Sequence, residues 1–284
     1  MTASTSASAG TAASASIGAP VVAGARWDPP AAIAVRGTVL LLPGRGEHAG
    51  VYDRFGRRLA ADGYAVRSAT PETVTAVAAD AVAPLVLAGS DTGALYALAL
   101  AATVPAAGVI AAGVPWAQPA QDPAAQDPAA QDPAAQDPAV LDQGVPDRGV
   151  LEREVLDRGF LDWGDELEAR SACPTHRARL EADGGFQRGT LAEPVPQALV
   201  EAVDPAAIAL PVLLVHGGAD LVAPLSGARE LAARLARAEL ATVRDGRHDA
   251  LNDSTHRTVA AHVVQWLERL RADPATVAAI LTVS

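Results

Sequence analysis

The sequence predicts an α/β fold in which a mostly parallel sheet is flanked by helices. Short apolar segments of strand length alternate with segments of helical spacing along most of the 284 residues. Glycine-rich turns follow several of these strands, as expected where parallel strands form a binding site at their carboxyl ends. A long insertion of different composition follows the fourth predicted strand, in the position of a cap over that edge of the sheet.

Four strands are predicted before the insertion. Residues 38–42 are an apolar run closed by Pro43 and Gly44, which is typical of a strand buried on both faces. The segments that follow are predicted to be helix 52–62, strands 64–66 and 84–88, helix 94–102 and strand 108–112. After the insertion, apolar runs and helical spacing predict strand 211–215, helix 226–237, strand 240–243 and helix 255–270.

Composition changes sharply at two places and divides the chain. Residues 1–25 are rich in Ala, Ser and Thr and are predicted to be a disordered tail. Residues 26–113 and 205–284 form the predicted core, and 114–204 the predicted cap insertion. Within it, 119–160 repeat QDPAA and related pentapeptides, a period that matches neither a helix nor a strand. Regular proline forbids a continuous helix there, so we expect a disordered insertion without a direct chemical role.

The charge balance excludes several classes of function. Acidic residues number 33 against 22 basic ones, a net charge of −11 that disfavours nucleic acid and anionic membranes as partners. All basic residues are Arg, which excludes lysine chemistry, and the single Cys excludes an internal disulfide. The sequence shows neither a signal peptide nor a membrane span. We expect a cytoplasmic protein with a small-molecule substrate and without a metal or organic cofactor.

The stretch Gly89-Ser-Asp-Thr-Gly93 is the most informative motif. A strand, a turn of the form Gly-x-nucleophile-x-Gly and a helix describe a nucleophile elbow, where small residues relieve a strained turn. The central residue is Asp91, although serine is usual there. Centring the motif on Ser90 is an alternative, but it places larger residues at the two small positions. An ordinary turn in which Asp91 caps the helix is the structural alternative.

A glycine-rich loop, 43–50, directly follows the first predicted strand. The backbone amide of Arg45, together with that of Thr92, predicts an oxyanion hole. Gly44, Glu47 and His48 in the same loop are candidates for contact with a substrate. A turn that only joins strand to helix explains the loop equally well.

Two later strands end in residues that complete a catalytic constellation. Asp220 follows one strand and His248 follows the next, so both are expected at the same sheet edge as Asp91. In the order nucleophile, acid and histidine, His248 is the predicted general base and Asp220 fixes its orientation. The flanking Asp245 and Asp249 are expected to be solvated.

Together these motifs resemble the α/β-hydrolase family, in particular its monoacylglycerol lipase and lysophospholipase-like branch. The loop Gly44-Arg-Gly-Glu-His48, the segment around Asp220, His248 and a terminal helix carry the resemblance, which covers 36–112 and 205–271. It implies the α/β-hydrolase fold and hydrolysis of small carboxylic or lipid esters.

The aspartate at the elbow opens an alternative to ester hydrolysis. A carboxylate that attacks an ester carbonyl forms a costly anhydride, whereas attack on sp³ carbon forms an ordinary enzyme ester, as in dehalogenases and epoxide hydrolases of this fold. Trp116 and Trp163 are candidate halide donors, although packing roles also explain them. A catalytically silent ligand-binding scaffold is the alternative from a different class.

Overall fold

A computed structural model of the chain describes residues 24–116 and 162–272. Its centre is a seven-stranded sheet in the order β1-β3-β2-β4-β5-β6-β7. Every neighbouring pair is parallel except β1 with β3. The strands are β1 (Arg26–Trp27), β2 (Gly37–Leu42), β3 (Tyr64–Ser68), β4 (Leu85–Ser90), β5 (Gly108–Ala112), β6 (Val212–Gly217) and β7 (Ala238–Val243).

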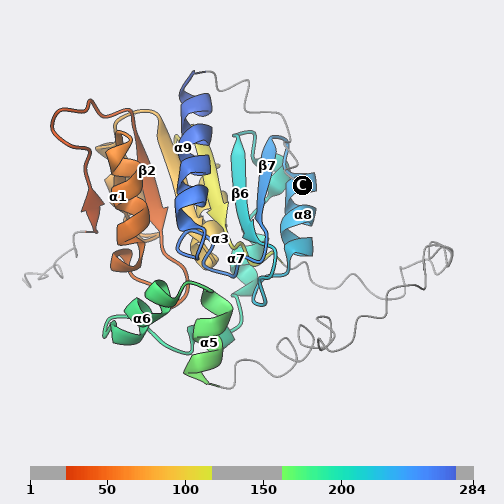
Figure 1. Cartoon of the computed structure of the whole chain (residues 1–284). Helices are drawn as coiled ribbons and strands as arrows, with labels where there is room; N and C mark the ends of the chain where they lie inside the picture. The colour runs from red at the N-terminus through yellow and green to blue at the C-terminus, as the bar shows by residue number, and fades with distance from the viewer. Residues whose placement is uncertain (1–23, 117–161, 273–284) are drawn as a thin grey trace, which may run out of the picture.

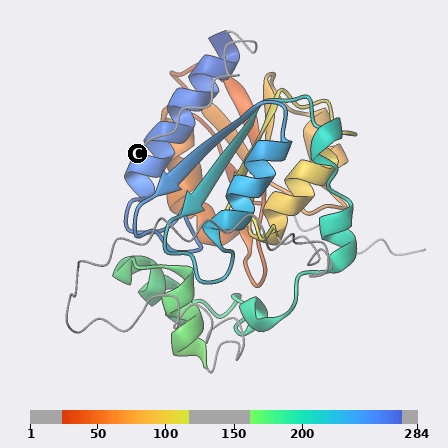
Figure 2. The same cartoon turned by 90° about the vertical axis from the view of Figure 1, so that its right-hand side faces the viewer.

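Helices cover both faces of this sheet and bury a separate apolar core on each (Figures 1 and 2). One core lies under α1 (Asp53–Ala61) and α9 (His256–Ala272). The other lies under α2 (Val74–Ala79), α3 (Thr92–Leu100), α7 (Gln197–Glu201) and α8 (Leu225–Arg234). Strands β2, β4, β5 and β6 contribute residues to both cores, which explains why their sequences are almost continuously apolar.

Residues 162–204, which are most of the described part of the predicted insertion, are here called the connecting segment. It holds α5 (Trp163–Arg170), α6 (Pro174–Ala182), the short turn Thr190–Ala192 and α7. Helices α5 and α6 lie together beyond one end of the sheet (Figure 1). Backbone bonds from His248 to Ala169 and from Asp249 to Arg170 tie α5 to the loop after β7. The connecting segment therefore adjoins the edge where the predicted site residues lie.

The predicted strands and the major helices are all present, with ends that shift by a few residues. The mostly parallel sheet flanked by helices is confirmed. Outside the predicted insertion, a strand and an α-helix were not predicted: β1, which is two residues long, and α2, which is six. Within the insertion, α5, α6 and α7 were not predicted either. The predicted pentapeptide repeats at 119–160 and most of the tail at 1–25 lie outside the described residues. Within residues 24–116 and 162–272, no helix is long and apolar enough to cross a membrane.

Candidate active site

Asp91 occupies a strained turn between β4 and α3. Its φ of 52° and ψ of −126° are values that residues other than glycine rarely adopt. A Cβ on Gly89 would overlap the backbone of Gly93, and a Cβ on Gly93 would overlap the carbonyl of Leu42. The two glycines thus let strand and helix approach closely, which is the physical reason for the motif. Ser90, the alternative centre, ends β4 and is buried.

Arg45 binds Asp91 with both its main chain and its side chain. The backbone N–H and Nε each donate to Oδ2 of Asp91 at 2.8 Å, and Nη2 donates to Oδ1 at 2.8 Å. The remaining nitrogen, Nη1, donates to the carbonyls of Leu191 and Glu193 at 3.3 and 2.6 Å. The Thr92 hydroxyl lies 3.5 Å from Oδ2. The amide predicted for an oxyanion hole therefore holds the Asp91 carboxylate itself.

His248 and Asp220 lie beside this pair. Nδ1 of His248 is 2.8 Å from Oδ2 of Asp220, whose other oxygen accepts the backbone N–H groups of Val222 and Ala223 at 2.8 and 3.0 Å. Nε2 of His248 faces Oδ1 of Asp91 at 3.3 Å. The structure thus brings all three predicted side chains together, with the histidine between the two carboxylates.

The charges in this constellation stabilise one another. Burial lowers the pKa of His248, but the carboxylates of Asp220 and Asp91 outweigh it and raise the pKa to about 10. Burial raises the pKa of Asp91, but contacts with His248 and Arg45 outweigh it and hold the pKa well below its ordinary value. These opposite shifts favour an Asp91 carboxylate beside a protonated His248 at neutral pH, and a protonated imidazole is not a base.

Removing the charge of Asp91 should therefore change the titration of His248. We expect the wild-type imidazole to remain doubly protonated at pH 8, and its pKa to fall by about 1–3 units in Asp91→Asn. Because the folded pKa lies above the ordinary value of 6.5, the stability gained from this proton is complete below pH 6.5 and is lost as pH rises through about 10. Imidazole ¹⁵N shifts measure this directly, and a neutral ring in the wild type at pH 7 would contradict it.

Glu47 belongs to the same loop as Arg45, and its side chain is buried. One of its carboxylate oxygens accepts the Tyr52 hydroxyl and the Gly44 backbone N–H. Burial and the charge of Asp249 raise its pKa to about 7, against the opposing effect of Arg170. These contacts assign Glu47 to holding the loop in shape, whereas the sequence predicted contact with a substrate.

Arg170, from α5, is the centre of the buried charges and is 0% exposed. It donates to Glu166 at 2.9 Å, and its Nη1 lies 3.7 Å from Asp249. It also donates to the carbonyl oxygen of Arg45 at 2.9 Å. The expectation that Asp249 is solvated is wrong: this side chain is 2% exposed and pairs with His176 at 3.2 Å, because α5 and α6 pack over it.

The other predicted contact residues lie in ordinary structural roles. His48 pairs with Asp183 at 2.9 Å, and its side chain is 40% exposed. Trp116 belongs to the core under α3, and Trp163 packs against Phe186 with ring centroids 5.5 Å apart. Both indole rings are packed against apolar neighbours, and the Nε1 atom of each is buried without a hydrogen-bond partner among the described residues.

Sequence reasoning missed two functional side chains. For Arg45 it considered the backbone amide alone, although an arginine in the loop that directly follows β2 was a visible sign of an anion partner at the sheet edge. Arg170 stands four residues after Glu166, a spacing that indicates an ion pair on a helix. Within 24–116 and 162–272, no cluster of three or more His, Cys, Asp or Glu side chains could hold a metal ion.

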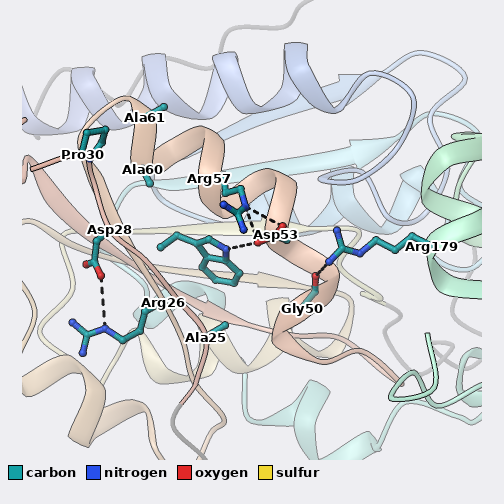
Figure 3. A pocket seen from close by; sticks show the side chains of 11 residues that line it. Ala25, Arg26, Asp28, Pro30, Gly50, Asp53, Arg57, Ala60, Ala61 and Arg179 are labelled. Atoms are coloured by element: carbon teal, nitrogen blue, oxygen red, sulfur yellow. Dashed lines mark hydrogen bonds and ion pairs between the residues drawn. The ribbon is translucent and has the colours of Figure 1, made fainter. Parts of the chain in front are cut away.

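A separate cavity of about 570 Å³ lies on β1 and α1 (Figure 3). Its charged groups already have partners: Asp53 accepts Trp27 Nε1 and Arg57, and Arg179 donates to the carbonyl of Gly50. Arg26 and Asp28, which also line the cavity, pair with each other at 4.0 Å, so each charged group in its wall has a partner.

Comparison with known families agrees with this geometry. Residues 72–255, more than half of the chain, match the Hydrolase_4 family, described as serine aminopeptidase S33. The chain belongs to this family. The matched residues include β4, Asp91, Asp220 and His248, and the family description contains the word serine, whereas this chain carries Asp91 at the centre of the turn. The predicted assignment to the α/β-hydrolases, in their monoacylglycerol lipase-like branch, and the predicted enzyme class, hydrolase, are confirmed.

Solved structures of the same fold include two lipases. A monoacylglycerol lipase from Paleococcus ferrophilus is 21% identical with a TM-score of 0.60, over 87% of this chain and 98% of that one. A soluble variant of monoglyceride lipase from Saccharomyces cerevisiae, solved with a substrate analogue, is 16% identical with a TM-score of 0.60, over 86% and 90%. An esterase from Thermogutta terrifontis is 17% identical with a TM-score of 0.53, over 84% and 92%. No curated protein sequence matches the chain.

Proposed function

We propose that this family member is a hydrolase that forms a covalent ester on Asp91 by attacking sp³ carbon. The observation that carries the proposal is the position of Oδ2 of Asp91 on the Arg45 amide, at 2.8 Å. In an ordinary ester hydrolase that amide receives the substrate's carbonyl oxygen. In this protein Oδ2 of Asp91 occupies the position of that carbonyl oxygen. The amide of Arg45 would therefore polarise the carbonyl group of an ester formed on Asp91.

The first step is displacement at carbon. Oδ1 of Asp91 forms a bond to the substrate carbon, and the leaving group departs with the electron pair of its bond. The new ester retains Oδ2 as its carbonyl oxygen on the amide of Arg45. Because the carboxylate charge of Asp91 has disappeared, one cause of the raised pKa of His248 is gone, although Asp220, the larger cause, remains. The second step requires the imidazolium then to give its proton to solvent.

The second step hydrolyses this ester. Neutral His248, oriented by Asp220, takes a proton from water that attacks Cγ of Asp91, and the amide of Arg45 stabilises the negative charge on Oδ2. The intermediate collapses, the alcohol leaves with Oδ1 and the proton from His248, and the carboxyl group returns its proton to the imidazole. The balance is one water consumed, with an alcohol, the leaving anion and one proton released.

A second candidate is direct hydrolysis of small carboxylic or lipid esters. It is favoured by the family and by the lipases and esterases that share the fold. It requires Asp91 to leave the Arg45 amide so that a substrate carbonyl can bind there. It also requires a base other than the His248 imidazolium, and for both reasons it ranks second.

Trapping the intermediate tests the proposal. We expect His248→Gln in a Cys173→Ser background to accumulate an alkyl ester on the peptide that contains Asp91. The probes are bromoacetate, bromoacetamide, 1-bromobutane and styrene oxide, and intact-mass and peptide mass spectrometry read the adduct. The cysteine change removes the competing thiol, and Asp91→Asn in the same background is the matched control.

The outcomes separate the two candidates. An adduct on Asp91 that is absent from the control supports the covalent ester. Turnover of p-nitrophenyl butyrate by the wild type, with Asp91 unmodified by every alkylating probe, overturns the proposal in favour of substrate esters. If the protein reacts with none of the alkylating probes and does not hydrolyse p-nitrophenyl butyrate, the proposal is also overturned, and the ligand-binding scaffold is favoured.

A further inference from the structure

A cavity of about 320 Å³ lies between α9 and the last strand of the sheet, β7, and is here called the flank cavity. In Figure 1, α9 lies over the middle of the sheet and β7 lies to one side of it. The apolar lining of the cavity consists of Val215, Ala241, Val243 and Val259. Ala241 and Val243 pack against the core under α9 but are only partly buried. The apolar core therefore continues to the surface at this place.

The periods of the two elements produce this lining. Ala241 and Val243 share one face of β7, because side chains alternate along a strand. Thr258, Val259 and His262 recur at helical spacing and share one side of α9. Ala241 and Thr258 carry short side chains, which leave the space between strand and helix unfilled.

Arg244 gives the flank cavity a positive charge without a counter-ion. This residue follows β7 directly, lines the cavity, and pairs with no carboxylate in the part of the chain that the structure describes. His262 also lines the cavity, but its Nε2 lies 2.9 Å from Oε1 of Glu239, whose other oxygen accepts Arg269. The chain has 33 acidic and 22 basic residues, so a shortage of carboxylates does not explain an arginine without an acidic partner.

The size and polarity of the flank cavity limit what it can bind. Its volume lies near the lower end for small-molecule sites. At about 30 Å³ for each water-sized group, it holds about ten non-hydrogen atoms, which is too few for a nucleotide. An apolar lining disfavours a sugar, whose hydroxyl groups would lose their hydrogen bonds to water. A guanidinium beside such a lining favours one carboxylate on an aliphatic chain.

We propose that the flank cavity binds a medium-chain aliphatic carboxylate, with the chain on the valine lining and the carboxylate on Arg244. Octanoate, which has about ten non-hydrogen atoms, matches the volume. Each buried methylene contributes up to about fourfold in affinity. The ion pair adds about threefold to tenfold, because Arg244 is exposed and water screens its charge. This binding does not depend on a covalent ester at Asp91, so either proposal can fail without the other.

Titration of the full chain with octanoate tests the proposal, with ¹³C-labelled valine methyl groups as the reporters. We expect the signals of Val215, Val243 and Val259 to shift together and to give one dissociation constant. Octanamide, the neutral analogue, should bind about threefold to tenfold more weakly. Butanoate, whose chain is half as long, should bind more weakly than octanoate by about tenfold or more.

Arg244→Met should lower the affinity for octanoate to that for octanamide and leave octanamide binding unchanged, which also shows that the variant is folded. Arg229→Met is the matched control, because Arg229 is an exposed arginine of α8, which covers the opposite face of the sheet. It should leave both affinities unchanged. In Asp91→Asn the valine titration should also stay as in the wild type, since the flank cavity is separate from the active site.

Four results would each overturn the proposal. The first is a set of lining valines that does not respond to octanoate. The second is an octanoate affinity that equals the octanamide affinity in the wild type or that Arg244→Met leaves unchanged. The third is loss of the shifts in Asp91→Asn, which would place the ligand at the active site. The fourth is movement of the same signals with protein concentration and not with octanoate, which would assign this face to a second copy of the chain.

Discussion

Replacing Asp91 by asparagine is expected to lower kcat/KM on the order of 10⁴-fold or more, because loss of a nucleophile removes the covalent pathway and leaves only the residual effect of the pocket. Asparagine has nearly the shape of aspartate and tolerates a positive φ better than most residues, so the turn at φ 52° should persist. Steady-state rates of bromide release measure the effect, with circular dichroism as the check on folding.

Ser90→Ala is the matched control for this change. Ser90 is the neighbouring buried residue and the alternative centre of the motif, and we expect its loss to change kcat/KM by less than about threefold. An inactive Ser90→Ala beside an active Asp91→Asn would transfer the nucleophile to the serine. Hydrolysis of a p-nitrophenyl ester by the wild type, Asp91→Ala and Asp91→Ser then tests whether the pocket can support acyl chemistry. Ester hydrolysis by Asp91→Ser alone would show a pocket competent for acyl chemistry and a natural substrate of another kind.

Arg170→Met is expected to cause the largest loss of stability, about 3–5 kcal/mol in the free energy of unfolding. The guanidinium is 0% exposed and lies within 3.9 Å of carboxylate oxygens of Glu47, Glu166 and Asp249. Methionine has a similar length but leaves these three buried carboxylates facing one another without a cation. Urea unfolding followed by tryptophan fluorescence measures the loss.

The pH dependence distinguishes lost charge from lost packing. In the wild type the pKa of Glu47 already stands at about 7, with Arg170 among the groups that lower it. Removal of Arg170 raises that pKa further, and a raised folded pKa means that stability is lost as pH rises through it. The deficit should therefore be larger at pH 8 than at pH 5.5. Arg58→Met, at an exposed pair with Asp62, is the control and should cost less than about 1 kcal/mol at either pH.

The fold and the three central residues were predictable because they depend on local pattern. Apolar runs such as 38–42, closed by Pro43 and Gly44, have the length and flanking residues of strands buried on both faces, and parallel strands bring their carboxyl ends to one edge. Asp91 directly follows β4, and Asp220 and His248 lie in the loops after β6 and β7, so a correct assignment of the strands was sufficient to bring them together.

The partners of these residues were not predictable in the same way. The side chain of Arg45 reaches Asp91 because Nη1 is anchored on the carbonyls of Leu191 and Glu193, which lie about 150 residues later in the chain. Asp249 appeared solvated because the sequence does not show that α5 and α6 cover it. Both features depend on how the connecting segment packs against the sheet edge, and its short helices carry few apolar residues to reveal that placement.

The carboxylate on the amide of Arg45 also determines how this protein behaves in a chemical survey of hydrolases. Fluorophosphonate reagents find members of the fold by phosphonylating a serine hydroxyl. On Asp91 the same attack would give a mixed anhydride that water removes, so an intact member of the family would escape labelling. Electrophiles that alkylate, such as epoxides and halomethyl carbonyl compounds, are the reagents that would label it, and a survey built on serine chemistry alone undercounts proteins with this elbow.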